Sequence, residues 1–452
     1  MKKFLIPCAL TACIIASTLS FSACSNKDGE NVLRIASWDE YIDEGGEESY
    51  VEGSRAIYEE FVDWYFEQTG KKITVEYIPL QDNETMYNKI KMGDSYDLLC
   101  PSEYMIMKLA EEGKLQKYPD SFFDASIETN YYAQNLSPFI KQRLEDDSLK
   151  LSDGSKLSEY TAGYMWGSTG FVFDPAKVSR SQVETWNIFT SDAVKRKITA
   201  KDNVRDTYFV GLGMYYEQEL LALKRQYQNS EITFKQYQDS LSHLMNDTSP
   251  ETVSAVQRIL EKMRKNLYGL ETDEGKLDIV TGRFDVSYQW SGDAVYVLDL
   301  AEDPTVTSTP RELEYCIPKA SSNLWFDGWV MMKDSKMTEE AMAFVNYVSR
   351  PDNVVRNMDY IGYTSCIAGD EVFEYLQDPE KFGAGDEEGA PYDVSYFFGS
   401  GYVLDANKSQ VEKHRQLFAQ YPTPDTLERL VVMRYFDKKT NEKVNRMWNM
   451  IK

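Results

Sequence analysis

Aromatic side chains stand beside carboxylates at several points of this sequence. Four such residues follow one another directly after the apolar run 32–36: Trp38, Asp39, Glu40 and Tyr41. The pairing recurs twice downstream: Trp290 with Asp293, and Trp325 with Asp327. Aromatic faces attract a cation, and carboxylates accept hydrogen bonds from its N–H groups. The pattern therefore indicates a binding site for a small organic cation.

A core position explains each tryptophan taken alone, because large aromatic side chains are usually buried. It does not explain why each has a carboxylate within three positions. A buried carboxylate without a partner is costly, so such a group requires a cation. No Arg or Lys lies close in sequence to the pairs at 290–293 and 325–327. We therefore expect a ligand to supply the missing positive charge.

Catalytic chemistry is hard to assemble from this sequence. The two histidines, His243 and His414, lie in charged helical segments, and we expect both to be solvated. The sequence contains no GxSxG, P-loop or HExxH motif. Carboxylate pairs could serve an exported hydrolase, but acidic pairs are common in a chain with 73 Asp and Glu. We expect neither an enzyme nor a cofactor or metal site.

The bulk composition limits the class of protein. A length of 452 residues predicts two domains, or one domain with large insertions. The formal net charge of −24 argues against binding to nucleic acid and favours the approach of cations.

The N-terminus has the features of an export signal. Met1, Lys2 and Lys3 precede a mostly apolar run, and Phe21-Ser22-Ala23-Cys24 resembles a lipobox. We predict a signal peptide at 1–23, lipidation of Cys24 and a polar tether at 24–30. The apolar run is too short and too rich in small residues for a membrane-spanning helix. The mature protein is thus expected on the outer face of the cytoplasmic membrane, which is the periplasmic side if the organism has an outer membrane.

Three cysteines remain beyond the lipobox: Cys100, Cys316 and Cys366. Their wide spacing forms neither a metal motif nor a disulfide framework. We expect three buried free thiols.

The first part of the chain alternates predicted strands with helices. Strands are expected at 32–36, 73–78 and 96–100, and helices at 55–68, 84–92 and 103–112. Asn83 and Ser102 are the predicted N-caps of the last two helices. Such alternation indicates a mostly parallel sheet, with ligands beyond the carboxyl ends of its strands. Trp38–Tyr41 and Ser102–Tyr104 both occupy that position.

The remaining chain is expected to cross between two lobes. Segments 164–173 and 325–332 are the predicted crossings, and 217–266 should be helical with Ser249 as an N-cap. A tight glycine turn is expected at 291–293, an irregular insertion at 370–410 and a helix at 439–450. Lobe 1 is predicted to comprise 31–163 and 327–370, and lobe 2 to comprise 164–326 and 371–452.

Taken together, these motifs resemble the spermidine/putrescine-binding proteins of bacterial ABC transporters. The likeness is strongest in seven short segments: 37–42, 83–87, 96–102, 164–167, 325–327, 350–352 and 361–363. The resemblance implies an α/β fold, a two-lobed periplasmic-binding-protein (type II) clamshell. Each lobe would contain a mixed, mostly parallel sheet, and hinge crossings would join the lobes.

The resemblance also implies the residues of the site. An aromatic box around the methylene chain would comprise Trp38, Tyr41, Tyr104, Trp290, Trp325 and Tyr363. Asp327 would bind one ammonium group, Ser102 would add a polar contact, and Asp206 would stand at the far end. Asp293 and Glu40 match putrescine-type members, and Glu40 is favoured over Asp39 as an ammonium partner. Asn203 stands where spermidine-type members often carry Asp.

The function implied is capture of a polyamine, putrescine or spermidine, and its delivery to the permease of an ABC transporter. We expect a monomer attached to the membrane only by its lipid. A solute-binding protein for a different small ligand, a sensor or adhesion lipoprotein and, with less support, an exported hydrolase are the alternatives.

Overall fold

The computed structural model describes residues 31–271 and 275–452. The predicted signal peptide, the tether and Cys24 lie outside the described residues. Within the described ranges, no helix is both long and apolar enough to cross a bilayer.

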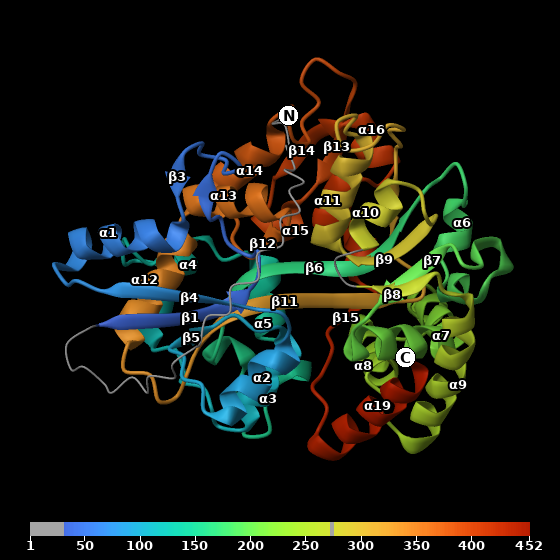
Figure 1. Ribbon diagram of the computed structural model, residues 1–452, viewed down its shortest axis with the longest axis horizontal. Helices are drawn as coiled ribbons and strands as arrows, with labels where there is room; N and C mark the ends of the chain where they lie inside the picture. Colours follow the sequence, from blue (N-terminus) through green and yellow to red (C-terminus); the bar gives the residue numbers. More distant parts are fainter. Residues whose placement is uncertain (1–30, 272–274) are drawn as a thin grey trace, which may run out of the picture.

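One continuous sheet runs through both lobes (Figure 1). Its main path is β4 (Thr74–Leu80), β1 (Val32–Trp38), β5 (Leu98–Leu99), β11 (Ser322–Met331), β6 (Ala162–Phe173), β9 (Val286–Trp290), β7 (Ile198–Lys201) and β8 (Gly269–Glu271). The pairs on each side, β4-β1-β5 and β9-β7-β8, are parallel. The central pairs, β5-β11-β6-β9, are antiparallel. The predicted α/β fold with two mostly parallel lobes is confirmed, and the crossing strands unite their sheets.

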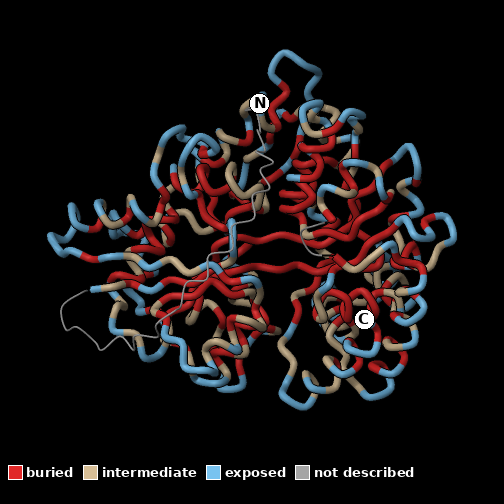
Figure 2. The backbone as a smooth tube through the Cα atoms, in the orientation of Figure 1, coloured by how far each residue is buried: buried red, intermediate tan, exposed pale blue. Residues whose placement is uncertain are grey.

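β6 and β11 are the two long strands that connect the lobes. Every residue of both strands is buried, and Figure 2 shows this buried band running across the middle of the molecule. Strands covered on both faces are rich in apolar residues, and these two also bury polar side chains, among them Ser168, Thr169 and Asp327. The register between the two strands shifts between Asp327 and Gly328. Such a bulge re-aims a side chain, and here it lies at a predicted ligand residue.

The helices of lobe 1 follow the predicted order: α1 (Ile57–Thr69), α2 (Asn83–Met92) and α3 (Glu103–Glu111). The N-cap of α2 was predicted wrongly, and Ser102 is the N-cap of α3 by position only. Asp82, not Asn83, caps α2, because its carboxylate accepts from Thr85 N at 2.6 Å. Ser102 precedes α3 but makes no side-chain capping bond. The Asn83 amide and Ser102 instead bond to each other, through Asn83 Nδ2 to Ser102 Oγ at 2.9 Å.

The second hydrophobic cluster lies in lobe 2 and is covered by three long helices. These are α7 (Val204–Gln228), α8 (Phe234–Met245) and α9 (Pro250–Asn266). Ser249 caps α9 as predicted. The tight glycine turn expected after β9 is instead the first turn of a helix, α11 (Ser291–Glu302), with Trp290 in its N-cap position.

The C-terminal segment is more regular than expected and is shared between the two cores. The predicted insertion contains α14 (Asp370–Gln377), β13 (Gly389–Asp393), α15 (Ser395–Phe398) and β14 (Val403–Asn407). Its buried side chains belong to the first hydrophobic cluster, together with those of lobe 1. The last helix, α19 (Lys438–Ile451), packs in the second cluster with α9. Residues 371–452 thus divide between the two hydrophobic clusters.

Shorter elements complete the described chain: β2 (Gly45–Gly46), β3 (Ser54–Arg55), α4 (Tyr131–Asn135), α5 (Pro138–Leu144), α6 (Arg180–Val183), α10 (Gly275–Val280), β10 (Glu314–Cys316), α12 (Thr338–Val348), α13 (Pro351–Ile361), β12 (Thr364–Ser365), α16 (Lys408–Glu412), α17 (Gln416–Gln420), α18 (Pro424–Leu427) and β15 (Leu430–Val431). The three cysteines are buried free thiols, as predicted. His243 is exposed.

His414 is not solvated, contrary to the prediction. It stacks on Phe418 with ring centroids 4.2 Å apart, and its Nδ1 lies 3.0 Å from Arg180 Nη1. Burial, together with the charges of Arg180 and Arg429, lowers the pKa of His414 to about 4.

Candidate functional site

Asp327 lies at the centre of the predicted site. It follows Phe326 on β11, at the bulge, and only 4% of its surface is exposed. Trp38 Nε1 and Tyr41 OH both donate to Asp327 Oδ2, each at 2.9 Å. Trp38 is the last residue of β1, and Tyr41 follows it by three residues. The two hydrogen bonds therefore join the end of β1 to the bulge in β11. The structure therefore brings Trp38 and Tyr41 into contact with Asp327, which lies nearly 290 positions later in the sequence.

The second oxygen of this carboxyl group, Oδ1, is buried and has no hydrogen-bond partner among the described residues. Burial raises the pKa of Asp327 to about 6, although nearby Ser102, Tyr41 and Trp38 act in the opposite direction. A buried carboxylate oxygen without a partner is costly unless a cation or another donor reaches it. Oδ1 of Asp327 is thus available to accept a hydrogen bond from an N–H group of a ligand.

Aromatic rings cluster around Asp327. Tyr363 meets Tyr41 edge to face at 5.5 Å between centroids and meets Trp325 at 5.4 Å. Two glycines allow this approach: a Cβ at Gly292 would lie 2.1 Å from Tyr363, and one at Gly167 would lie 2.6 Å from Trp325. We call Trp38, Tyr41, Trp325 and Tyr363 the aromatic wall.

Asp206 and Trp290 mark the lobe-2 end of the site. Asp206 is buried in the first turn of α7. Burial raises its pKa to about 6, while the charge of Lys201 and the indole of Trp290 lower it. For Asp206, as for Asp327, the neighbouring donors and cations therefore do not fully offset the cost of burying the charged carboxylate.

Asp293 already has cationic partners, contrary to the expectation that its region lacks them. Lys201 Nζ lies 3.2 Å from Oδ2, and Lys276 Nζ lies 2.9 Å from Oδ1. Tyr363 OH also donates to Oδ1 at 3.1 Å. Burial alone would raise the pKa of Asp293, but the two lysines outweigh it and hold the pKa below its usual value.

Three further predicted residues have structural partners of their own. Tyr104 OH donates to Glu84 at 3.2 Å, and its ring lies 4.8 Å from the guanidinium of Arg205. Ser102 N donates to Asn83 Oδ1 at 3.0 Å, close to Asp327. The amide oxygen of Asn203 caps α7, so it is engaged by the backbone.

Asp39 and Glu40 are exposed and do not join the buried cluster. Glu40 has a φ of 51°, so the chain turns there. This turn points the chain back towards the core, and Tyr41 enters the site. The structure thus favours the aromatic residues of the 38–41 motif over its acidic ones.

The sequence patterns missed several charged groups beside the site. Glu103 is buried, and its burial and the charge of Asp327 raise its pKa well above the usual value. Lys201, Arg205 and Lys276 bring positive charge to the lobe-2 end. Glu103 and Arg205 gave a local signal, because Glu103 lies between Ser102 and Tyr104, and Arg205 lies between Asn203 and Asp206.

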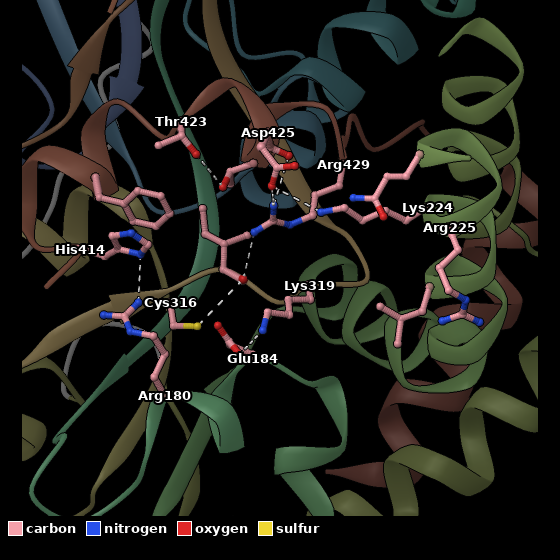
Figure 3. A pocket seen from close by; sticks show the side chains of 15 residues that line it. Arg180, Glu184, Lys224, Arg225, Cys316, Lys319, His414, Thr423, Asp425 and Arg429 are labelled. Atoms are coloured by element: carbon pink, nitrogen blue, oxygen red, sulfur yellow. Dashed lines mark hydrogen bonds and ion pairs between the residues drawn. The ribbon is translucent and has the colours of Figure 1, made fainter. Parts of the chain in front are cut away.

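A separate pocket of about 370 Å³ lies in lobe 2 (Figure 3). Five cationic side chains line it, against two carboxylates: Arg180, Lys224, Arg225, Lys319 and Arg429, against Glu184 and Asp425. This excess of positive charge disfavours a cationic ligand. The pocket is therefore not the site that the aromatic–carboxylate pairs predict.

Comparison with known proteins decides the family. Residues 60–372 match the family of bacterial extracellular solute-binding proteins. The chain belongs to this family. The solute-binding function predicted from the motifs is confirmed at this level, and so is a location outside the cytoplasm.

Among the described residues, no group of three or more His, Cys, Asp or Glu is placed to hold a metal.

Individual relatives share both sequence and fold with this solute-binding protein. The spermidine/putrescine-binding periplasmic protein of Escherichia coli is 25% identical over 350 residues, which cover 77% of this chain and 81% of the relative. The spermidine/putrescine ABC transporter substrate-binding protein PotD of Streptococcus pneumoniae superposes with a TM-score of 0.58 at 22% identity, covering 93% of this chain and 98% of that one. The TpPotD lipoprotein of Treponema pallidum gives a TM-score of 0.59 at 16% identity, covering 93% and 99%.

Proposed function

We propose that this solute-binding protein captures a polyamine, putrescine or spermidine, between its lobes and delivers it to the permease of an ABC transporter. The observation that carries the proposal is Asp327, a buried carboxyl group with one unpartnered oxygen beside an aromatic wall. The similar proteins named above for spermidine and putrescine support the same ligand class.

The chemistry of the site suits a flexible diamine. One ammonium group would donate to Asp327 Oδ1, and its methylenes would lie against the aromatic wall. Each cation–aromatic contact contributes about 0.5–2 kcal/mol. Asp206 would bind the second ammonium group, since its carboxyl group is buried at the lobe-2 end of the site and burial raises its pKa to about 6. Charge-assisted hydrogen bonds at the two ends would fix the ligand's orientation.

Contacts between the lobes link the ligand to the overall conformation. Tyr363 OH reaches Asp293 of α11, and Arg205 of α7 covers the ring of Tyr104 in α3. A ligand that contacts both lobes favours the state in which these contacts form. The permease would then recognise the closed form.

Membrane attachment also belongs to this proposal. Cys24 would carry the lipid, and residues 24–30 would tether a monomeric binding domain to the membrane surface. The lipoprotein of Treponema pallidum with the same fold supports this arrangement.

A thermal-shift panel tests the proposed ligand class. Putrescine, cadaverine, spermidine and spermine are each added to the purified protein. A ligand present at 100 times its Kd stabilises the folded state by about 2.7 kcal/mol, so at least one polyamine should raise the Tm by several degrees. Absence of a shift with all four would overturn the proposal.

Gly292→Ala tests the aromatic wall. The added methyl group would collide with Tyr363, so the ring must move and lose its hydrogen bond to Asp293. We expect about tenfold weaker polyamine binding by calorimetry and a loss of about 1–3 kcal/mol in the free energy of unfolding. Gly269→Ala is the matched control, because a Cβ there meets nothing within 4 Å. Unchanged affinity in Gly292→Ala would exclude a role for Tyr363 in binding.

A further inference from the structure

Lys201 places an ammonium group of the protein itself among the predicted ligand residues. It ends β7, and its side chain is fully buried, at 0% exposure. Its Nζ donates to Gln289 Oε1 at 2.5 Å and to Asp293 Oδ2 at 3.2 Å. The same nitrogen lies 4.1 Å from the centre of the Trp290 ring. A carboxylate, an amide oxygen and an aromatic face around one ammonium group are the contacts expected for the end of a polyamine.

The charge of Lys201 affects the whole lobe-2 end. Lys276, from α10, forms a second ion pair with Asp293, so that carboxylate holds two ammonium groups. Lys201 also acts on Asp206 and lowers its pKa. Of the buried carboxyl groups predicted to bind an ammonium group, Asp293 is therefore occupied by lysines of the protein itself, and Asp327 and Asp206 remain.

We propose that Lys201 is a resident ammonium group which occupies the cation position at Trp290 and Asp293, and that the site consequently selects diamines over triamines and tetraamines. This inference rests on the proposed function and specifies its ligand. Two ligand charges match Asp327 and Asp206, the two buried residues that remain of the predicted ammonium partners.

A third ligand charge would be disfavoured for two reasons. Like charges repel strongly where water is excluded, and Lys201 is buried. Lys201 also cannot withdraw cheaply, because leaving Gln289 and Asp293 would break a buried ion pair and a hydrogen bond. Both effects weaken the binding of any ligand that brings an additional ammonium group to the lobe-2 end of the site.

Two ligands of equal length isolate the effect of charge. Spermidine and 1,8-diaminooctane have terminal nitrogens separated by the same number of atoms, but spermidine carries an additional charged nitrogen. Calorimetry on the purified protein should show at least tenfold tighter binding of putrescine than of spermidine. It should also show tighter binding of 1,8-diaminooctane than of spermidine. Wild-type protein that prefers spermidine to both diamines would overturn the inference, without any need for a variant.

The variant Lys201→Met tests the residue itself. It should reduce the preference for putrescine over spermidine at least tenfold, while Lys201→Arg, which keeps the charge, should retain the preference. Lys177→Met removes an exposed positive charge from lobe 2 and should leave the ratio within twofold of the wild type. An unchanged ratio in folded Lys201→Met would overturn the inference.

The outcomes separate this inference from the proposed function. If no amine binds the wild-type protein, the proposed function fails and the inference falls with it. If polyamines bind but the wild type prefers spermidine, only the inference fails. If Lys201→Met does not fold, the comparison of spermidine with the two diamines on the wild type decides the question.

Discussion

Replacement of Asp327 by Asn is expected to weaken putrescine binding at least tenfold and, at the same time, to stabilise the protein without ligand. The loss of the anionic partner removes about 1.4 kcal/mol or more of binding free energy. The gain in stability follows from the raised pKa of about 6. A carboxyl group with an unfolded pKa of about 3.9 that must ionise in a buried site opposes folding at pH 7 by about 1–3 kcal/mol.

The two effects are measured separately, by calorimetric titration with putrescine and by chemical denaturation without ligand. Asp334→Asn, at an exposed position outside the site, is the matched control and should change neither quantity. Unchanged affinity in Asp327→Asn would refute the assignment of Asp327 as an ammonium partner. A lower free energy of unfolding for Asp327→Asn would show that neighbouring groups already stabilise the charged carboxylate in the protein without ligand.

Lowering the pH from 7.5 to 5 is expected to weaken polyamine binding by about tenfold for each carboxyl group that binds the ligand. Asp327 and Asp206 both have a pKa of about 6, mainly because of burial. Both are ionised at pH 7.5, and at pH 5 about nine-tenths of each is protonated in the free protein. The amines keep their charge throughout, so the loss of affinity reports on the protein.

The stability of the free protein should change in the opposite direction. The two carboxyl groups bind protons more readily when folded than when unfolded, so their contribution to stability rises as the pH falls from about 6 towards 4. Calorimetry at pH 5, 6 and 7.5 tests the binding effect, and Asp327→Asn should remove one of its two components. An affinity that does not vary with pH would contradict the assignment of both carboxyl groups.

The secondary structure around the site was largely predictable, because its signals are local. Ser249 caps α9 and α2 ends at Met92, as expected, and the predicted crossings at 164–173 and 325–332 lie on β6 and β11. The errors came from competition between neighbours. Asp82 took the capping role expected of Asn83, whose amide bonds to Ser102.

The charge pattern of the site was not predictable, because it depends on contacts between distant strands. The positions close in sequence to Asp293 contain no Arg or Lys, and this pattern predicts a ligand cation beside Asp293. Lys201 lies 92 positions earlier in the sequence and reaches Asp293 because β7 pairs with β9. The exposure of Glu40 similarly follows from a turn, which no periodic pattern reveals. The position of an ionic group depends on every charge in its neighbourhood, and a sequence pattern shows only the charges that are close along the chain.

A crystal structure of the protein with putrescine provides the most direct test of the proposed site. The site predicts a ligand nitrogen about 2.7–3.2 Å from Asp327 Oδ1, methylenes against the aromatic wall and the second nitrogen near Asp206. Lys201 should keep its contacts with Gln289 and Asp293. A putrescine bound elsewhere, or within the site but with Asp327 Oδ1 still unpartnered, would contradict the proposed mode of binding.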